Sequence, residues 1–291
     1  MHEKLQYKNL RQRVKQRLLA PGRENKYRKL WFGIQVFKFT CFIRGLISIG
    51  RFAEVFYVIL REIDDIGDGD TGNFTQLERV AIIKRTLQSY RHPNNPRNEL
   101  EWAIRYLVKL GARLPFSYQA ELEDIVQSIL FDAERLYSGR VYTAAELEEH
   151  FFPLDSRGTV RLTAKLYREE AERYTELLPL AQAVRIYYNV RDYPDDVAKG
   201  QINIPIEELT NLGIGRQVLM TSSLDSVKPW FRSECSRGLK LLRTYRATTN
   251  FRTLHWITKL TLWLVYERQA QRFFERRLAK YWLPQIPPRQ A

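Results

Sequence analysis

Apolar residues recur at intervals of three and four along most of the chain, the spacing that places them on one face of an α-helix. One such stretch covers residues 100–110. A second is marked by Leu254, Ile257, Leu260, Leu264 and Val265. Strict alternation of apolar and polar residues, which would indicate strands, is scarce. We therefore predict an all-α fold.

Proline and glycine separate these periodic stretches. Turn chemistry occurs in RHPNNPR at 91–97, GARLP at 111–115 and NLGIG at 211–215, as expected between consecutive helices. No repeat of fixed length is evident. A chain of 291 residues with 44% hydrophobic content can bury a full core, so we predict one large helical bundle.

The N-terminal residues form a basic segment of their own. Leu10, Val14 and Leu18 lie at helical spacing among many lysines and arginines, and Pro21 and Gly22 interrupt the pattern. We predict a basic amphipathic arm over residues 1–29, followed by a helical domain over residues 30–291. Two interpretations of the arm stay open, a solvated helix face or peripheral docking on an anionic membrane surface.

Composition narrows the class of partner. The net charge of +14 favours an anionic partner, which includes nucleic acid, lipid headgroups and phosphorylated substrates. Only two cysteines occur, and no signal peptide opens the sequence, so we expect a reducing cytoplasm. The apolar stretch from Leu30 to Gly50 contains Lys38 and Arg44 and is too interrupted to span a bilayer.

The first chemical signal is an acidic cluster in YVILREIDDIGDGD, from Tyr57 onward. Tyr57, Arg61, Asp64 and Asp68 follow steps of four, three and four, which places them on one helix face. Asp64, Asp65 and Asp68 repel one another unless a cation offsets their charge. Carboxylate oxygens suit Mg²⁺ that is bridged to substrate phosphates. The alternative is an acidic helix end without a ligand.

Other metal and nucleotide sites are excluded by the same sequence. In an EF-hand, Ile66 would stand at the third-position ligand and Thr75 at the bidentate glutamate. GIGRQV at Gly213 lacks the third glycine of a dinucleotide fingerprint, and the four histidines lack the spacing of zinc ligands. No nucleic-acid-binding module is recognisable, and the basic residues are dispersed, so we expect no nucleic-acid partner.

A second acidic cluster lies in RIYYNVRDYPDDVAKG at 185–200. Its polar residues follow helical steps at Arg185, Asn189, Asp192, Asp196 and Lys199. Pro194 removes a backbone hydrogen bond, so we expect a kink or a helix end between Asp192 and Asp196. A surface loop is the alternative for this segment.

These two clusters carry a resemblance to a known family. FAEVFYVILREIDDIGD and NVRDYPDDVAKGQINIP are similar to the first and second motifs of the squalene and phytoene synthases, in the same order and at a similar separation. Asp132, YTAAEL from Tyr142 and ITKLTLWLVYERQAQRFFERR with Tyr266 resemble the middle and the C-terminal helix of that family. The resemblance covers nearly everything after residue 35.

The resemblance implies an isoprenoid synthase fold with a central cavity and two acidic motifs on facing helices. It implies Mg²⁺ held by Asp64, Asp68, Asp192 and Asp196. Because Asp65 adjoins the first pair and Asn189 shares a helix face with Asp192, we include both as metal ligands. Contacts to the diphosphate are implied for Tyr57, Arg61 and Arg191. The expected substrate-binding set is completed by Arg185, Tyr188, Lys199 and Tyr266.

The expected reaction is the 1'-1 head-to-head condensation of farnesyl or geranylgeranyl diphosphate by a Mg²⁺-dependent prenyltransferase. In PLDSRGTVRL, however, Pro153, Asp155 and Arg157 replace the small residues that make room for prenyl tails in the family. This leaves an alternative, in which one prenyl group is cyclised or transferred to a non-isoprenoid acceptor, with Tyr187 or Tyr188 beside the allylic cation. A non-catalytic family member is the further alternative.

Overall fold

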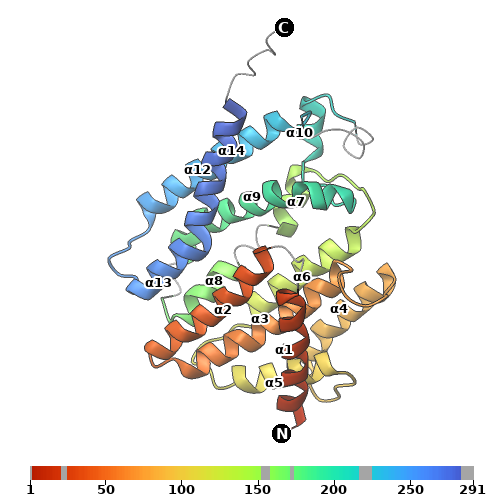
Figure 1. Ribbon diagram of the computed structural model, residues 1–291, viewed down its shortest axis with the longest axis vertical. Helices are drawn as coiled ribbons and strands as arrows, with labels where there is room; N and C mark the ends of the chain where they lie inside the picture. Colours follow the sequence, from red (N-terminus) through yellow and green to blue (C-terminus); the bar gives the residue numbers. More distant parts are fainter. Residues whose placement is uncertain (1, 21–24, 152–157, 171–173, 216–224, 283–291) are drawn as a thin grey trace. The chain divides into compact units, whose positions relative to one another are not determined.

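Figure 1 shows a computed structural model, which describes residues 2–20, 25–151, 158–170, 174–215 and 225–282. All regular secondary structure in these ranges is helical, which confirms the predicted all-α class. The chain divides into two compact units. The first comprises Met1–Leu136 and Arg161–Ala171, and the second comprises Tyr137–Val160 and Glu172–Ala291.

The first unit is built around one long, mostly buried helix, α3. Its helices are α1 (His2–Leu19), α2 (Asn25–Ile43), α3 (Ile47–Gly67), α4 (Gln76–Arg91), α5 (Glu99–Gly111), α6 (Gln119–Arg135) and most of α8 (Gly158–Leu166). Phe52, Val55 and Ile59 of α3 are almost completely buried, because α1, α2, α5 and α6 all pack against this helix. The turns predicted at 91–97 and 111–115 separate α4, α5 and α6.

The helix predicted in the N-terminal arm is present, but it belongs to the core of the first unit. Leu10, Val14 and Leu18 are fully buried where α1 packs on α5 and α3. Residue 29, where the sequence pattern suggested a boundary, lies within the first unit. The apolar side of α1, on which membrane docking of the arm would depend, is covered by protein.

The second unit pairs two long helices, α9 and α12. Its helices are α7 (Ala144–Phe151), α9 (Tyr174–Ala198), α10 (Ile206–Asn211), α12 (Lys228–Thr248), α13 (Trp256–Thr261), the π-helix η3 (Leu262–Glu267) and α14 (Arg268–Trp282). α12 packs against both α9 and α14. Within YTAAEL, Thr143 and Glu146 form a reciprocal cap at the start of α7, since each side chain accepts the other's backbone N–H.

Two further expectations from the sequence concern membrane crossing and the segment around residue 155. In the described part of the chain, no helix combines the length and the apolarity that crossing a bilayer requires. Pro153, Asp155 and Arg157, which motivated the alternative acceptor, lie outside the described residues.

Candidate functional site

The first acidic motif lies at the C-terminal end of α3 (Figure 1). Asp64 is in the last turn and Asp68 is the C-cap residue, whose backbone N–H donates to the Asp64 carbonyl at 2.9 Å. Gly69 follows with a φ of +75°, which turns the chain away from the helix axis. Carboxylates are unfavourable at this end of a helix dipole, so the motif needs nearby positive charge.

Asp65 receives that charge from two arginines and is fully buried. Its Oδ2 accepts from Arg17 Nε at 3.0 Å, and its Oδ1 accepts from Arg61 Nε at 2.8 Å. Both oxygens are therefore engaged inside the protein. We assign Asp65 a role in holding the two arginines and do not retain it among the proposed metal ligands.

Asp64 is the exposed member of the pair of adjacent aspartates. Its side chain is 38% exposed, and its Oδ2 lies 2.8 Å from Nη1 of Arg61, whose own side chain is only 11% exposed. Arg61 thus bridges a buried carboxylate and an accessible one. The hydroxyl of Tyr57, one turn earlier, is buried without a hydrogen-bond partner among the described residues, and burial raises its pKa above the usual range. This unpaired hydroxyl suits contact with a ligand oxygen.

A row of buried acids on α3, which were not among the predicted site residues, pairs with α1. Glu54 accepts from Arg11 Nε at 2.9 Å and from Lys38 Nζ at 2.7 Å. Burial alone would raise the pKa of Glu54, but these two bonds outweigh it and hold the pKa below its usual value. Glu62 pairs with Arg17. The intervals between the arginines of α1 differ from those between the acids of α3, so the sequence carried no spacing signal for this pairing.

The second acidic motif lies on α9, which continues through Pro194 to Ala198. Of the kink or helix end expected at this proline, the helix end is therefore wrong, and the kink stays a prediction. Pro194 is exposed and lies in the final turns of α9. Asp192 and Asp196 consequently share a face, one turn apart. Both are half-buried.

Arg191 is held beside Asp192 by an aromatic surface. Its Nε donates to Asp192 Oδ1 at 2.7 Å, and its Nη2 lies 2.5 Å from Oδ2. The guanidinium stacks over the rings of Tyr187 and Tyr188, with its carbon 5.0 and 4.7 Å from their centroids. The two tyrosines thus already face a cation that the protein supplies.

Asp196 is oriented by a residue that follows α9. Asn203 is 5% exposed, and its Nδ2 donates to Asp196 Oδ2 at 2.9 Å. The turn that brings Asn203 back depends on Gly200, which has a φ of +72°. A Cβ at this glycine would lie 3.1 Å from the Tyr137 and Gly139 backbone. Asn203 and Gly200 were not among the residues predicted for the site.

The remaining predicted site residues lie on α9, directly after it and in η3. Arg185 and Asn189 are half-buried on α9. Lys199 follows the end of α9, where its carbonyl accepts from the Tyr137 backbone N–H at 2.7 Å. Tyr266 is half-buried within η3. Their predicted contacts with substrate stay predictions.

The two acidic motifs supply only some of the ligands that Mg²⁺ needs. In the ranges that the structure describes, no group of three or more His, Cys, Asp or Glu side chains is arranged to hold an ion. Each motif instead supplies two half-buried carboxylates, Asp64 with Asp68 and Asp192 with Asp196. Mg²⁺ is commonly held by one or two carboxylates, with waters and substrate phosphates completing its octahedron. The residues therefore fit a metal that binds together with a phosphorylated substrate.

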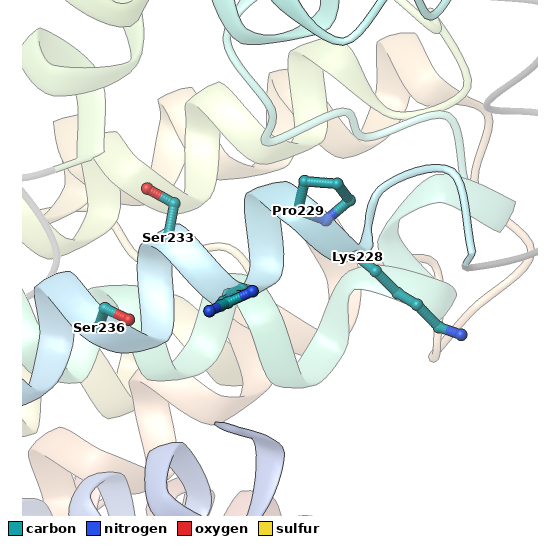
Figure 2. Close-up of a pocket in the computed structure, with 5 residues that line it drawn as sticks. Lys228, Pro229, Ser233 and Ser236 are labelled. Atoms are coloured by element: carbon teal, nitrogen blue, oxygen red, sulfur yellow. The ribbon is translucent and has the colours of Figure 1, made fainter. Parts of the chain in front are cut away.

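Two hollows in the described residues do not serve as a prenyl-binding site. An apolar void of about 10 Å³ lies in the core of the first unit between Ile59, Leu107 and Val126, and it is too small for a prenyl chain. A surface hollow of about 430 Å³ lies along α12 (Figure 2). All its lining residues come from one helix, and Lys228 is already paired with Asp225. It contains none of the predicted site residues.

The helix arrangement is that of the isoprenoid synthases. No family model matches the sequence, and no curated protein matches it significantly. Among solved structures, squalene synthase HpnC from Alicyclobacillus acidocaldarius matches with a TM-score of 0.67 and 14% identity, over 96% of this chain and 97% of that chain. A dehydrosqualene synthase in complex with a ligand matches with a TM-score of 0.57 and 14% identity, over 87% of this chain and 89% of that chain. The isoprenoid synthase fold that the family resemblance implied is thereby confirmed.

Proposed function

We propose that this protein is a divergent member of the squalene and phytoene synthase family. It ionises an allylic isoprenoid diphosphate, farnesyl or geranylgeranyl, for 1'-1 head-to-head condensation, and it requires Mg²⁺. The observation that carries the proposal is the pair of acidic motifs, each one helical turn long and each with an adjacent arginine, in a fold shared with a squalene synthase and a dehydrosqualene synthase.

The proposed chemistry follows from what these residues can do. Ionisation leaves negative charge on the diphosphate, and bound Mg²⁺ would neutralise it as a Lewis acid. Arg61 and Arg191 supply further positive charge that is already oriented, because Asp65 fixes the first and two tyrosine rings support the second. The Tyr57 hydroxyl can donate to a diphosphate oxygen. Asn203 holds Asp196 in one orientation.

The test is Mg²⁺-dependent release of pyrophosphate from farnesyl or geranylgeranyl diphosphate. We expect Asp64→Asn and Asp192→Asn to reduce the rate by at least about a hundredfold, since each removes a charge on which metal binding depends. Asp195→Asn is the matched control, because Asp195 is exposed beside the second motif. Wild-type rates in the Asp64 and Asp192 variants would contradict the assignment.

Product mass distinguishes the head-to-head reaction from its alternative. A hydrocarbon of twice the donor length, or its cyclopropyl diphosphate precursor, supports condensation of two prenyl chains. A cyclised or singly prenylated product would replace that proposal with the single-donor reaction, which retains the same metal and diphosphate chemistry.

One observation favours a non-catalytic binding protein as a second candidate. Both oxygens of Asp192 are bonded to Arg191, so the metal would have to compete with an internal ion pair. A non-catalytic protein would bind the diphosphate through its arginines and release no pyrophosphate with or without Mg²⁺. Equilibrium binding of a non-hydrolysable prenyl diphosphate analogue, measured beside turnover, separates the two candidates.

A further inference from the structure

The first acidic motif ends in a glycine turn. The backbone N–H of Gly69 donates to the Ile66 carbonyl at 3.1 Å, and that of Asp70 donates to the Asp65 carbonyl at 2.8 Å. Together these two bonds form a Schellman motif, in which Gly69 takes the left-handed position with a φ of +75°. The conformation of this turn places the backbone of Asp68, and it therefore sets the direction of the Asp68 carboxylate.

A side chain from α4 lies directly on this turn. A Cβ built on Gly69 would be 2.6 Å from Nη1 of Arg79, 2.8 Å from its Cζ and 2.9 Å from its Nη2. The guanidinium therefore covers the Cα of the glycine and fills the space that a side chain would otherwise occupy. Both residues belong to the first unit.

Arg79 is itself held in place. Its Nε donates to the Phe74 carbonyl at 3.0 Å, so one side chain contacts both ends of the loop between α3 and α4. The turn of α4 that carries Arg79 begins with a capping box, in which Thr75 and Glu78 each accept the backbone N–H of the other. The guanidinium is thus attached to a capped and ordered helix end.

That end of α4 has a fixed position relative to the end of α3. A Cβ at Gly67, in the last turn of α3, would lie 3.2 Å from Ile129 Cγ2 of α6 and 3.5 Å from Ile83 Cδ1 of α4. Gln76, the first residue of α4, joins α4 to α6, because its Nε2 donates to the Glu134 carbonyl at 2.8 Å. The three helices therefore form one packed base beneath the turn.

The charge and the position of Arg79 have opposite consequences for a bound cation. Positive charge beside Asp64 and Asp68 would by itself weaken the binding of Mg²⁺. A carboxylate that is held in one orientation would instead bind Mg²⁺ more tightly. Because Nη1 of Arg79 is buried and has no hydrogen-bond partner among the described residues, the guanidinium is committed to the turn and not to an acid there. The contact with Gly69 therefore outweighs the charge.

We propose that Arg79 is a positioning residue for the first acidic motif, which fixes the Gly69 turn and thereby orients the Asp68 carboxylate toward Mg²⁺. The inference rests on the proposed function, in which Asp68 is a metal ligand. Arg79 acts through the backbone of the turn and touches neither the metal nor the diphosphate. Groups that orient a metal ligand in this way typically change metal affinity or activity by about 10- to 100-fold.

The first experiment measures the Mg²⁺ concentration for half-maximal pyrophosphate release and, separately, for half-maximal binding of the thiolo analogue of farnesyl diphosphate. We expect Arg79→Ala and Arg79→Lys each to raise both concentrations at least about tenfold, because neither side chain can cover the turn as a guanidinium does. A purely electrostatic role predicts a lower concentration for Arg79→Ala and no change for Arg79→Lys. Lys84→Ala on the same helix is the matched control, since Lys84 is 54% exposed, and should behave as the wild type.

The second experiment tests the contact between Gly69 and Arg79 independently of activity. Urea unfolding of the wild type, Gly69→Ala, Arg79→Ala and the double variant gives a double-mutant cycle. Alanine at position 69 is strained by its positive φ in every case, but it displaces the guanidinium only when Arg79 is present. We expect Gly69→Ala to lower the folding equilibrium constant at least about threefold less in the Arg79→Ala background.

The two experiments distinguish the possible failures. Additive losses in the cycle, or wild-type Mg²⁺ dependence in both Arg79 variants, would overturn the positioning role and leave the proposed function in place. Tighter Mg²⁺ binding by Arg79→Ala alone would make Arg79 an electrostatic group instead. A wild type that neither releases pyrophosphate nor binds the analogue would contradict the proposed function and with it any role of Arg79 toward a metal, while the cycle would still decide whether Arg79 holds the turn.

Discussion

The two acidic motifs share a sequence pattern but are held in place by different means. At the end of α3, Asp65 is buried and is clamped by Arg61 of its own helix and by Arg17 of α1. On α9, by contrast, Asp192 is paired with the adjacent Arg191, and both side chains are more than a quarter exposed. The first motif depends on a second helix, whereas the second depends on its immediate neighbours.

Because of this difference, we expect substitutions around the first motif to lower stability more than substitutions around the second. Buried charges are costly to leave unpaired, so the first motif should be sensitive to changes in residues that could never touch a substrate. The second motif should tolerate loss of its ion pair with little change in stability, because water can replace the lost contact. Substitutions at Arg17, at Asp64 and Asp65, and at Gly200 test that contrast.

The largest expected effect is on Arg17, whose loss leaves Asp65 and Glu62 short of a partner inside the protein. We expect Arg17→Met to lower the free energy of unfolding by about 3 kcal/mol, the lower end for a broken buried pair because Arg61 remains. Lys15→Met on the same helix is the control and should cost less than about 1 kcal/mol, since Lys15 is exposed. Urea unfolding measures both, and equal losses would remove the contrast.

Replacing each of the two adjacent aspartates by asparagine should affect stability in one case and activity in the other. We expect Asp65→Asn to lower the free energy of unfolding by about 2 kcal/mol, because two arginines lose the negative charge between them. Asp64→Asn should leave stability nearly unchanged while removing Mg²⁺-dependent activity, since Asp64 is accessible. Thermal unfolding measured beside turnover tests this pair, and the reverse pattern would assign the ligand role to Asp65.

In the second motif, the turn after α9 should matter more than the ion pair. Gly200→Ala combines an unfavourable positive φ with close backbone contacts, so we expect a loss of about 2 kcal/mol. Gly213→Ala has a similar φ of +66° but open space around the new Cβ, and it should cost about 1 kcal/mol. Identical losses for the two variants, measured by urea unfolding, would show that the contacts of Gly200 do not matter.

Acid should weaken the first unit through its buried carboxylates. Burial raises the pKa of Glu121, but its bonds to Lys165 and Arg161 outweigh that effect and lower it. A carboxyl whose pKa is lowered by folding stabilises the protein above its unfolded pKa of about 4.3, and that stabilisation is lost as pH falls through the folded value. The slope of stability below pH 4.3 should therefore be smaller in Glu121→Gln, by at most about 1.4 kcal/mol per pH unit. An unchanged acid slope would contradict the assignment.

Local sequence predicted the helices, the turns and the acidic motifs. The apolar spacing at 100–110 corresponds to α5, and the glycine and proline turns on either side separate it from α4 and α6. These features depend on residues close in the chain, whose spacing is fixed by the geometry of the helix. The stretch from Leu254 to Val265 does not form one regular α-helix face. The π-helix η3 widens the helix there and leaves Leu264 and Val265 exposed.

Burial could not be derived from the sequence, because it depends on which surfaces meet. Asp64 and Asp65 are identical and adjacent, and only the packing of α1 on α3 makes one accessible and the other part of the core. The sequence by itself determined the carboxylates that are proposed to carry the chemistry. The tertiary structure decided which of them are reachable, since solvent exposure and ion pairing are set by helices distant in the chain.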